Sequence, residues 1–261
     1  MSDTHPSSPE MDVVEHVHPQ DIVSALVILG SALLFWEVVV SVKEVPIYLL
    51  PPPSLIFKTL WQQRIHYARS SLVTLGEALA GLALGMLIGT FSAVGITLWQ
   101  RLERVVLALA ILIKATPMVA IAPLLIIWFG FGPVPKIIIT ALLTFFPVLI
   151  NVHAGLHAVD PAFLALFHSL HANRIEVFRY VRWPSAMAYI FAALKVVGPL
   201  AIVGAVVAEW AGASAGLGRA MWLAYANLNM PALFAAILCS AAMGIGIYLA
   251  INYLEDRVIT W

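Results

Sequence analysis

Long apolar stretches separated by short polar segments dominate this sequence. Each is about 20 residues long, the length needed to cross the roughly 30 Å of hydrocarbon in a bilayer. The pattern predicts six transmembrane helices, at residues 22–42, 71–98, 105–130, 136–152, 187–210 and 231–254. We therefore expect an all-α, polytopic membrane protein with one transmembrane domain over residues 22–261 and both termini on the same side.

Small residues and prolines distinguish two of these stretches. Gly81, Gly85 and Gly89 are four residues apart, so they share one helix face on which a neighbouring backbone can approach closely. Pro117 and Pro123 interrupt the third stretch, and each removes a helical hydrogen bond. We expect the glycine face to pack against protein, and the broken helix to suit a pathway better than an anchor.

The segment between the first two stretches has its own helix signal. Residues 51–53 are prolines that block a helix, and Ser54 follows them as a candidate N-cap for an amphipathic stretch. Trp61 and Tyr67 are typical of the headgroup zone. We expect an interfacial helix on the outer side.

Composition supports the bilayer as the solvent. Charged residues make up 11% of the chain and hydrophobic residues 62%, whereas soluble domains have about 25% charged residues. The 14 basic and 14 acidic residues cancel without forming a basic cluster, so no nucleic-acid partner is expected. Cys239 is the only cysteine, which excludes an internal disulfide.

The N-terminal segment, residues 1–21, is polar and lacks both Lys and Arg. It has no apolar core followed by a small-residue cleavage site, so we expect a retained, flexible cytoplasmic tail. His5, His16 and His18 are not at ligand spacing, and no metal site is predicted.

Basic residues give the predicted orientation. Arg101 and Arg104 lie in one loop, and Arg174, Arg179 and Arg182 lie in another. Cytoplasmic loops carry an excess of such residues, so both loops and both termini are expected in the cytoplasm.

The hydrophilic segment at residues 153–186 has the signals of folded structure. Asp160 followed by Pro161 is a typical helix start, and Asn173 with Glu176 has the spacing of a capping box. We expect two short helices that meet near Ala172.

One face of the second short helix is apolar. Ile175, Phe178 and Val181 lie three residues apart, with arginines beside them. This ridge predicts a docking surface for a protein, although a helix lying flat on the membrane has the same pattern.

At this segment the chain resembles a known family. The stretch AVDPAFLALFHSLHANRIEVFRYVRWPSAMAYIFAAL resembles the loop that ABC-importer permeases present to their ATPase, and LPPPSLIF, TPMVAIAPLLIIWFGFG and VAEWAGASAGLG resemble the nitrate, sulfonate, taurine and thiamine-pyrimidine branch. The resemblance implies a MetI-like permease fold and a coupling loop at residues 153–186. Its implied ATPase-coupling residues are Ser169, Leu170, His171, Ala172, Arg174, Ile175, Val177, Phe178, Val181 and Pro184.

Two positions depart from the family pattern. Ala165 stands where the family usually has Glu, and His171 stands where it usually has Gly. The resemblance therefore implies less about the geometry of the turn between the two short helices than about the helices themselves.

The resemblance also implies partners. A GxxxxGK[ST] phosphate-binding loop is absent from the sequence, so the ATPase must be a separate chain and this chain is not expected to be an enzyme or to hold a cofactor. The implied partners are a cytoplasmic ATPase dimer, a second permease copy and an extracytoplasmic substrate-binding protein, assembled in the bacterial inner membrane.

Charged residues inside apolar stretches are candidates for the translocation pathway, because a central charge costs about 2.5–3.5 kcal/mol on insertion scales. Lys114 lies near the predicted bilayer centre, and Glu209 lies in a family-like segment. The predicted pathway residues are Lys114, Pro117, Glu209 and Trp210. Glu37 and Lys195 are expected to reach the interface instead.

For the solute, KVVGPLAIVGAVVAEWAGASAGLG resembles permeases for thiamine-pyrimidine precursors or riboflavin. Aromatic faces and hydrogen-bonding groups near the fifth stretch would suit such a heterocycle: Phe191, Trp210, Trp222, Tyr225, Glu209 and Asn227. Two alternatives stay open, a permease for nitrate, sulfonate, taurine or another small anion, which Lys114 would suit, and a secondary transporter.

Overall fold

The computed structural model describes residues 19–259 of the chain. The predicted N-terminal tail and its three histidines lie outside this range, apart from the last three residues of the tail, which are helical. Within the described range every regular element is a helix. In chain order these are α1 (Pro19–Val42), α2 (Pro53–Gln62), α3 (Arg64–Leu98), α4 (Gln100–Ala115), α5 (Met118–Phe129), α6 (Val134–His157), α7 (Pro161–Ser169), α8 (Arg174–Val177), η1 (Phe178–Arg182), α9 (Trp183–Ala211), α10 (Leu217–Ala226) and α11 (Met230–Val258).

The chain divides into two compact units, with the boundary between Ser54 and Leu55. In the first unit, α1 is an apolar helix with mostly exposed side chains, as expected of a helix that faces lipid. Glu37 accepts hydrogen bonds from the Ser54 backbone N–H at 2.9 Å and from its hydroxyl at 2.7 Å. Ser54 is not the predicted N-cap, because α2 already begins at Pro53. The Ser54 hydroxyl and N–H bind the Glu37 carboxylate instead.

Five helical segments of the described chain are long and apolar enough to cross a membrane, and a bent pair gives up to six. The expected interruption of the third span lies at Pro117, where α4 and α5 meet at 91°. Pro117 precedes α5 in an extended conformation, and proline disfavours helical geometry at the residue before it, Thr116. Pro123, by contrast, lies inside α5.

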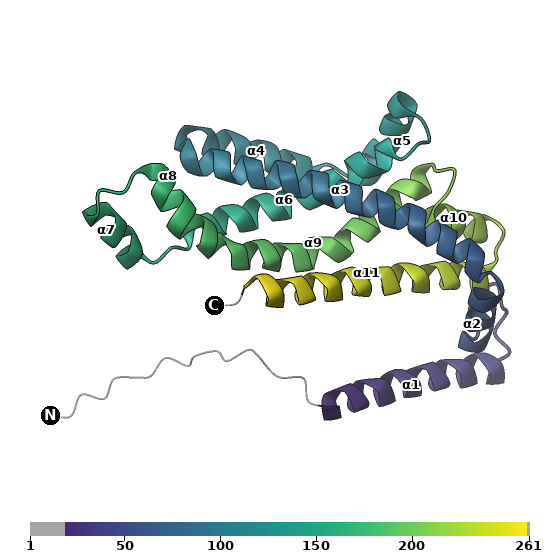
Figure 1. Ribbon diagram of the computed structural model, residues 1–261. Coiled ribbons are helices and arrows are strands. Elements are labelled where there is room, and N and C mark those ends of the chain that lie inside the picture. The colour runs from purple at the N-terminus through teal and green to yellow at the C-terminus, as the bar shows by residue number, and fades with distance from the viewer. Residues whose placement is uncertain (1–18, 260–261) are drawn as a thin grey trace. The chain divides into compact units, whose positions relative to one another are not determined.

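In the second unit α3, α6, α9 and α11 run side by side (Figure 1). The prediction for the glycine face of α3 is confirmed: a Cβ at Gly81, Gly85 or Gly89 would collide with α6. At Gly85 the obstacle includes the backbone carbonyl of Ala141, 2.6 Å away, which cannot move aside as a flexible side chain could. Small residues thus bring the two backbones together, as is usual where no hydrophobic effect drives helix association in lipid.

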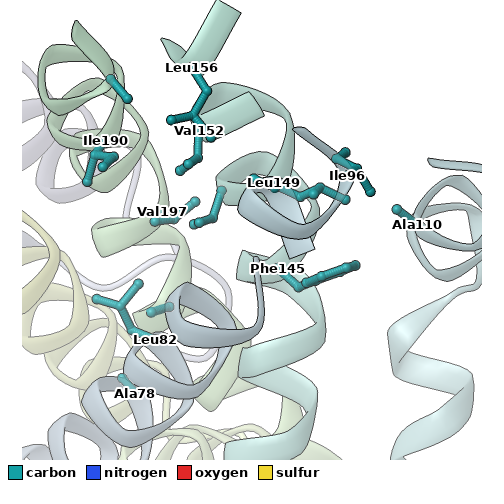
Figure 2. Packing of buried hydrophobic residues seen from close by; sticks show 14 of the residues in the cluster. Ala78, Leu82, Ile96, Ala110, Phe145, Leu149, Val152, Leu156, Ile190 and Val197 are labelled. Carbon is teal, nitrogen blue, oxygen red and sulfur yellow. The ribbon is translucent and has the colours of Figure 1, made fainter. Parts of the chain in front are cut away.

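The apolar core lies where α6 passes between α3 and α9. Figure 2 shows Leu149 and Val152 of α6 between Ile96 of α3 and Ile190 of α9. Close packing there gives a rigid unit. Figure 1 places α7 and α8 at one end of this unit, and α5 and α10 at the opposite end.

Candidate functional site

The two short helices at one end of the unit form as their capping signals predict. The Asp160 side chain accepts a hydrogen bond from the Ala162 N–H at 2.8 Å and starts α7. Asn173 accepts from the Glu176 N–H at 2.9 Å, and Glu176 accepts from the Asn173 N–H at 2.7 Å, which completes a capping box at the start of α8. Local side-chain chemistry therefore defines both helix starts.

The turn between α7 and α8 contains His171, which stands where the family usually has glycine. This residue has φ +55°, in the left-handed region. The Ala172 N–H donates to the Phe167 carbonyl and the His171 N–H donates to the His168 carbonyl, both at 3.0 Å. These bonds make a Schellman motif with His171 at the position where glycine is favoured, so the turn keeps its geometry with a strained histidine.

The His171→Gly variant is therefore expected to stabilise the turn by about 1 kcal/mol, because glycine adopts a positive φ without the Cβ penalty. Hydrogen exchange of the backbone amides between residues 161 and 177 would show slower exchange in the variant. The matched control is His168→Gly, which places glycine inside α7 and should speed exchange. Equal or faster exchange in His171→Gly would contradict this description of the turn.

The predicted ridge on the second short helix is wrong. Ile175 is 75% exposed, but Val181 is only 7% exposed, and Phe178 packs against the apolar core. Even at 3.6 residues per turn, Ile175 and Val181 lie about 120° apart around the helix, so only one of them can face away from the bundle. The π-helical turn η1 follows α8 directly. The Phe178 ring lies 6.0 Å from the Trp183 ring, so this residue joins the segment to the bundle.

Three other apolar side chains are exposed on this segment together with Ile175, and the four are here called the docking face: Phe163, Leu166, Leu170 and Ile175. The first three are spaced as i, i+3 and i+7, which places them on one side of α7 and its C-terminal end. Of the other predicted coupling residues, Ser169 and Arg174 are exposed, Ala172, Val177 and Pro184 are half-buried, and the Ser169 hydroxyl donates to the Leu166 carbonyl. The segment thus has an apolar surface that its own unit does not cover.

At the opposite end of the unit, four polar side chains are buried together. This buried polar cluster consists of Thr74 and Glu77 of α3, Lys136 of α6 and Glu209 of α9. Lys136 is fully buried and Glu209 is 1% exposed. Both carboxyl groups lie close enough to the Lys136 ammonium to interact with it electrostatically. Such charges are costly at membrane depth, and here charges of opposite sign are buried near one another.

The buried polar cluster forms hydrogen bonds with two loops. Lys136 Nζ donates to the carbonyls of Phe131 at 2.8 Å and Gly132 at 2.9 Å, in the α5–α6 loop. Glu209 accepts from the Thr74 hydroxyl at 2.7 Å and from the Gly218 N–H at 2.5 Å, at the start of α10. The α5–α6 loop and the α9–α10 loop are therefore held at the same polar centre.

The glycines of the GLG sequence in this second loop make the contact possible. A Cβ at Gly216 would overlap the Glu209 carboxylate, and Gly216 also has φ +106°. A Cβ at Gly218 would collide with the Val206 carbonyl. Only residues without a side chain fit this close to the buried carboxylate.

A pocket of about 400 Å³ opens between these two loops and α3. Glu77 lines it together with Gly132 and Ser214. The Glu77 Oε2 atom is buried and has no hydrogen-bond partner within the described residues. Any movement of either loop would change the size of this pocket.

The predicted pathway residues do not come together in one site. Lys114 and Pro117 are exposed near the bend between α4 and α5, with Lys114 Nζ 4.6 Å from the centre of the Phe146 ring. Glu209 is buried with both oxygens bound by groups of this chain, which contradicts its predicted place in the lining for this conformation. Trp210, the next residue, is 43% exposed.

The aromatic residues proposed for a heterocycle are also divided. Phe191 is buried in the bundle, so its ring is not available to a solute. Trp210 and Tyr225 are exposed, with ring centres 6.0 Å apart. Trp222 lies against the Arg219 guanidinium at 4.9 Å, and the Asn227 amide donates to the Leu223 carbonyl of its own helix. Only the pair Trp210 and Tyr225 presents adjacent exposed rings.

Sequence reasoning missed Thr74 and Lys136 as members of the buried polar cluster. Lys136 lies at the predicted start of a span, where a lysine usually reaches the interface. Thr74 looks like any threonine in a membrane helix. The one signal was Glu77, an acid within an apolar stretch three residues after Thr74, which demanded a partner.

Sequence comparison finds relatives among transport permeases. A probable ABC transporter permease protein of Haemophilus influenzae is 32% identical over 91% of this chain and 97% of its own length. The formylaminopyrimidine transport permease protein ThiX of Halalkalibacterium halodurans is 30% identical, covering 88% and 92% of the two chains. The riboflavin transport system permease protein RibX of Chloroflexus aurantiacus is also 30% identical, covering 90% and 88%. Permeases named for aliphatic sulfonates, taurine and nitrate match at 28%, 26% and 25% identity.

Structural comparison finds the same fold in an amino acid ABC transporter crystallised with histidines. The TM-score is 0.61 at 19% identity, over 77% of this chain and 98% of the other. The family model described as binding-protein-dependent transport system inner membrane component matches residues 68–260. The MetI-like fold and the multi-pass inner-membrane location are thus confirmed, and the chain belongs to this family of ABC-importer permease subunits.

Proposed function

We propose that the docking face binds a cytoplasmic ABC ATPase and that α9 carries the movement of the ATPase to the loops at the other end of the unit. The observation behind this proposal is a folded segment outside the spans with an exposed apolar surface. A helix lying on the membrane would need only an apolar stripe, whereas α7 and α8 are held as a compact pair by caps and a defined turn.

A continuous helical segment joins the two ends of the unit, which supports the proposed transmission of movement from the ATPase to the loops. Helical structure runs without a gap from Arg174 to Ala211, which is 38 residues, or about 57 Å at 1.5 Å per residue. Ile175 lies at one end of this run, and Glu209 lies at the other. A displacement of the docking face would therefore shift the carboxylate that fastens the α9–α10 loop, and with it the pocket beside Glu77.

The π-helical turn η1 lies within this run, between the docking face and the core. Such turns are frequent at functional sites, where they change the hydrogen bonding of a helix locally. In the proposed mechanism η1 sets the angle between α8 and α9, and Phe178 fixes that angle through its contact with the core.

The remaining partners follow from the same arrangement. One chain supplies half of a pathway, so we propose a second permease copy, with a homodimer favoured, and a soluble substrate-binding protein on the outer side. With α7 and α8 in the cytoplasm and the bent α4–α5 pair counted as one span, both termini are cytoplasmic.

For the solute we favour a flat heterocycle, such as a thiamine-pyrimidine precursor or a flavin. The support comes from the relatives named for formylaminopyrimidine and riboflavin and from the adjacent exposed rings of Trp210 and Tyr225, which would stack on a planar ring. An oxyanion such as nitrate or a sulfonate is the second candidate, supported by the exposed ammonium of Lys114 in the bent span.

Uptake into vesicles that carry the full complex tests this proposal. We expect saturable, ATP-dependent uptake of a labelled aminopyrimidine or flavin, and no uptake of nitrate or taurine. Lys114→Gln should leave heterocycle uptake unchanged, because this solute needs no cation in the pathway. ATP-dependent uptake of an anion but of neither heterocycle, lost in Lys114→Gln, would reject the heteroaromatic assignment in favour of the anion.

A further inference from the structure

A basic pocket and an apolar groove adjoin each other between α3 and the start of the coupling segment. The groove, of about 890 Å³, is lined by side chains of α3 between Ala83 and Val94, apolar except for Thr90, and by Ile175, Phe178, Arg179 and Trp183. The pocket, of about 760 Å³, is lined by the end of α3 from Thr97, by Trp99 and by Arg101 of α4 on one side. Phe178 lines both cavities, so they form one continuous surface with an apolar and a basic part.

Three arginines line the basic pocket: Arg101, Arg174 and Arg182. Arg101 and Arg174 are exposed, and neither forms an ion pair with an acidic residue of the described chain. Arg182 donates one hydrogen bond, through Nη1, to the Leu156 carbonyl at 3.3 Å. Its remaining N–H groups could bind an anion. Three guanidinium groups without carboxylate partners repel one another and favour an anion with several oxygens.

The dimensions of the groove match one leaflet of a bilayer. From Ala83 to Val94 is 11 residues, or about 16 Å along the helix, and half of a hydrocarbon core is about 15 Å. α3 ends at Leu98, and Trp99 follows at the point where tryptophan usually marks the membrane interface. A bilayer with its interface at Trp99 would place the groove at acyl-chain depth and the three arginines of the basic pocket at headgroup depth.

We propose that this surface binds an anionic phospholipid, with its phosphate in the Arg101–Arg174–Arg182 pocket and an acyl chain in the groove beside Phe178. The order of apolar and basic parts along α3 is the order of tail and headgroup in a lipid. A soluble anion would use only the pocket, and an acidic segment of the ATPase would leave the groove empty. The lipid fills both parts, and it does so next to η1, whose angle the proposed function depends on.

Native mass spectrometry of the purified full-length chain tests the proposal. The protein is exchanged into detergent with equal amounts of phosphatidylglycerol and phosphatidylcholine, and the lipid that remains bound is counted. We expect phosphatidylglycerol to be retained preferentially. Arg101→Gln combined with Arg174→Gln should lower its retention by about fivefold for each arginine removed. Arg104→Gln, an exposed arginine on the same helix that does not line the pocket, is the matched control and should change nothing.

The groove is tested separately. Ala83→Trp should fill it and reduce retention, whereas Ala80→Trp, one turn earlier on α3 and outside the groove, should not. Equal retention of the two lipids by the unaltered chain, or unchanged retention in the double arginine variant, would overturn the proposal. So would displacement of the lipid by millimolar inorganic phosphate, which would show a soluble-anion site. Loss of ATPase binding with unchanged lipid retention in the double variant would assign the arginines to the ATPase instead.

Discussion

Replacing Glu209 by alanine is expected to cause the largest loss of stability of any single change in the buried polar cluster. The substitution removes the acceptor of the Thr74 hydroxyl and of the Gly218 N–H, and it leaves the buried Lys136 ammonium with one carboxyl group fewer. Breaking a buried charge network by removing one partner typically costs about 3–5 kcal/mol. Thermal unfolding of the purified permease in detergent should show a correspondingly lower Tm.

The control for Glu209 is Glu255→Ala. Glu255 is paired with Lys195, but both side chains are partly exposed, so the loss should be within about 1 kcal/mol. Glu209→Gln keeps the shape of the side chain and one acceptor oxygen. Its loss of stability should therefore lie between those of Glu209→Ala and Glu255→Ala. If Glu209 lined the pathway instead of fastening the loop, Glu209→Ala would alter uptake while the Tm stayed unchanged. That outcome would contradict the structural assignment.

Replacing Ile175 by aspartate is expected to abolish stable binding of the ATPase while the permease stays folded. Ile175 is 75% exposed, so the permease itself loses little packing. If the side chain is buried in the complex, losing that burial costs about 1.5–3 kcal/mol, and the new carboxylate adds the cost of desolvating a charge. Copurification of the ATPase with tagged permease measures the effect, and we expect ATP-dependent uptake to be lost with it.

Two further variants separate docking from folding. Ile175→Leu keeps an apolar side chain of similar size and should retain the ATPase. Phe178→Asp should instead lower the Tm of the permease, because that ring packs against the core and lies beside Trp183. Full ATPase copurification and full uptake with Ile175→Asp would show that the docking face has another task.

Several features of the fold were predictable from short-range patterns in the sequence. Helix starts were predictable at Asp160 and Asn173, because a cap depends on residues within one turn. The packing face of α3 was predictable from Gly81, Gly85 and Gly89, because spacing alone places small residues on one side of a helix.

Features that depend on non-local geometry were not predictable. A proline marks a place where a helix can bend, but the 91° angle before Pro117 depends on what α4 and α5 pack against. The ridge through Phe178 and Val181 failed because these side chains pack against the bundle, and that packing depends on residues far away in the sequence. Lys136 lies near carboxyl groups of two distant helices, Glu77 of α3 and Glu209 of α9, and no spacing in the sequence reveals this.

The central claim, that the docking face contacts the ATPase, is tested most directly by cross-linking from single cysteines in the assembled importer. Cys239 would first be replaced by serine, since it is the one native cysteine. A cysteine at Ile175 is then compared with one at Ile127 of α5, which is equally exposed, at 76% against 75%, but lies at the opposite end of the unit (Figure 1). We predict cross-links to the ATPase from position 175 and none from position 127. Cross-links from position 127 alone, or from neither position in a complex that still hydrolyses ATP and transports solute, would contradict the account.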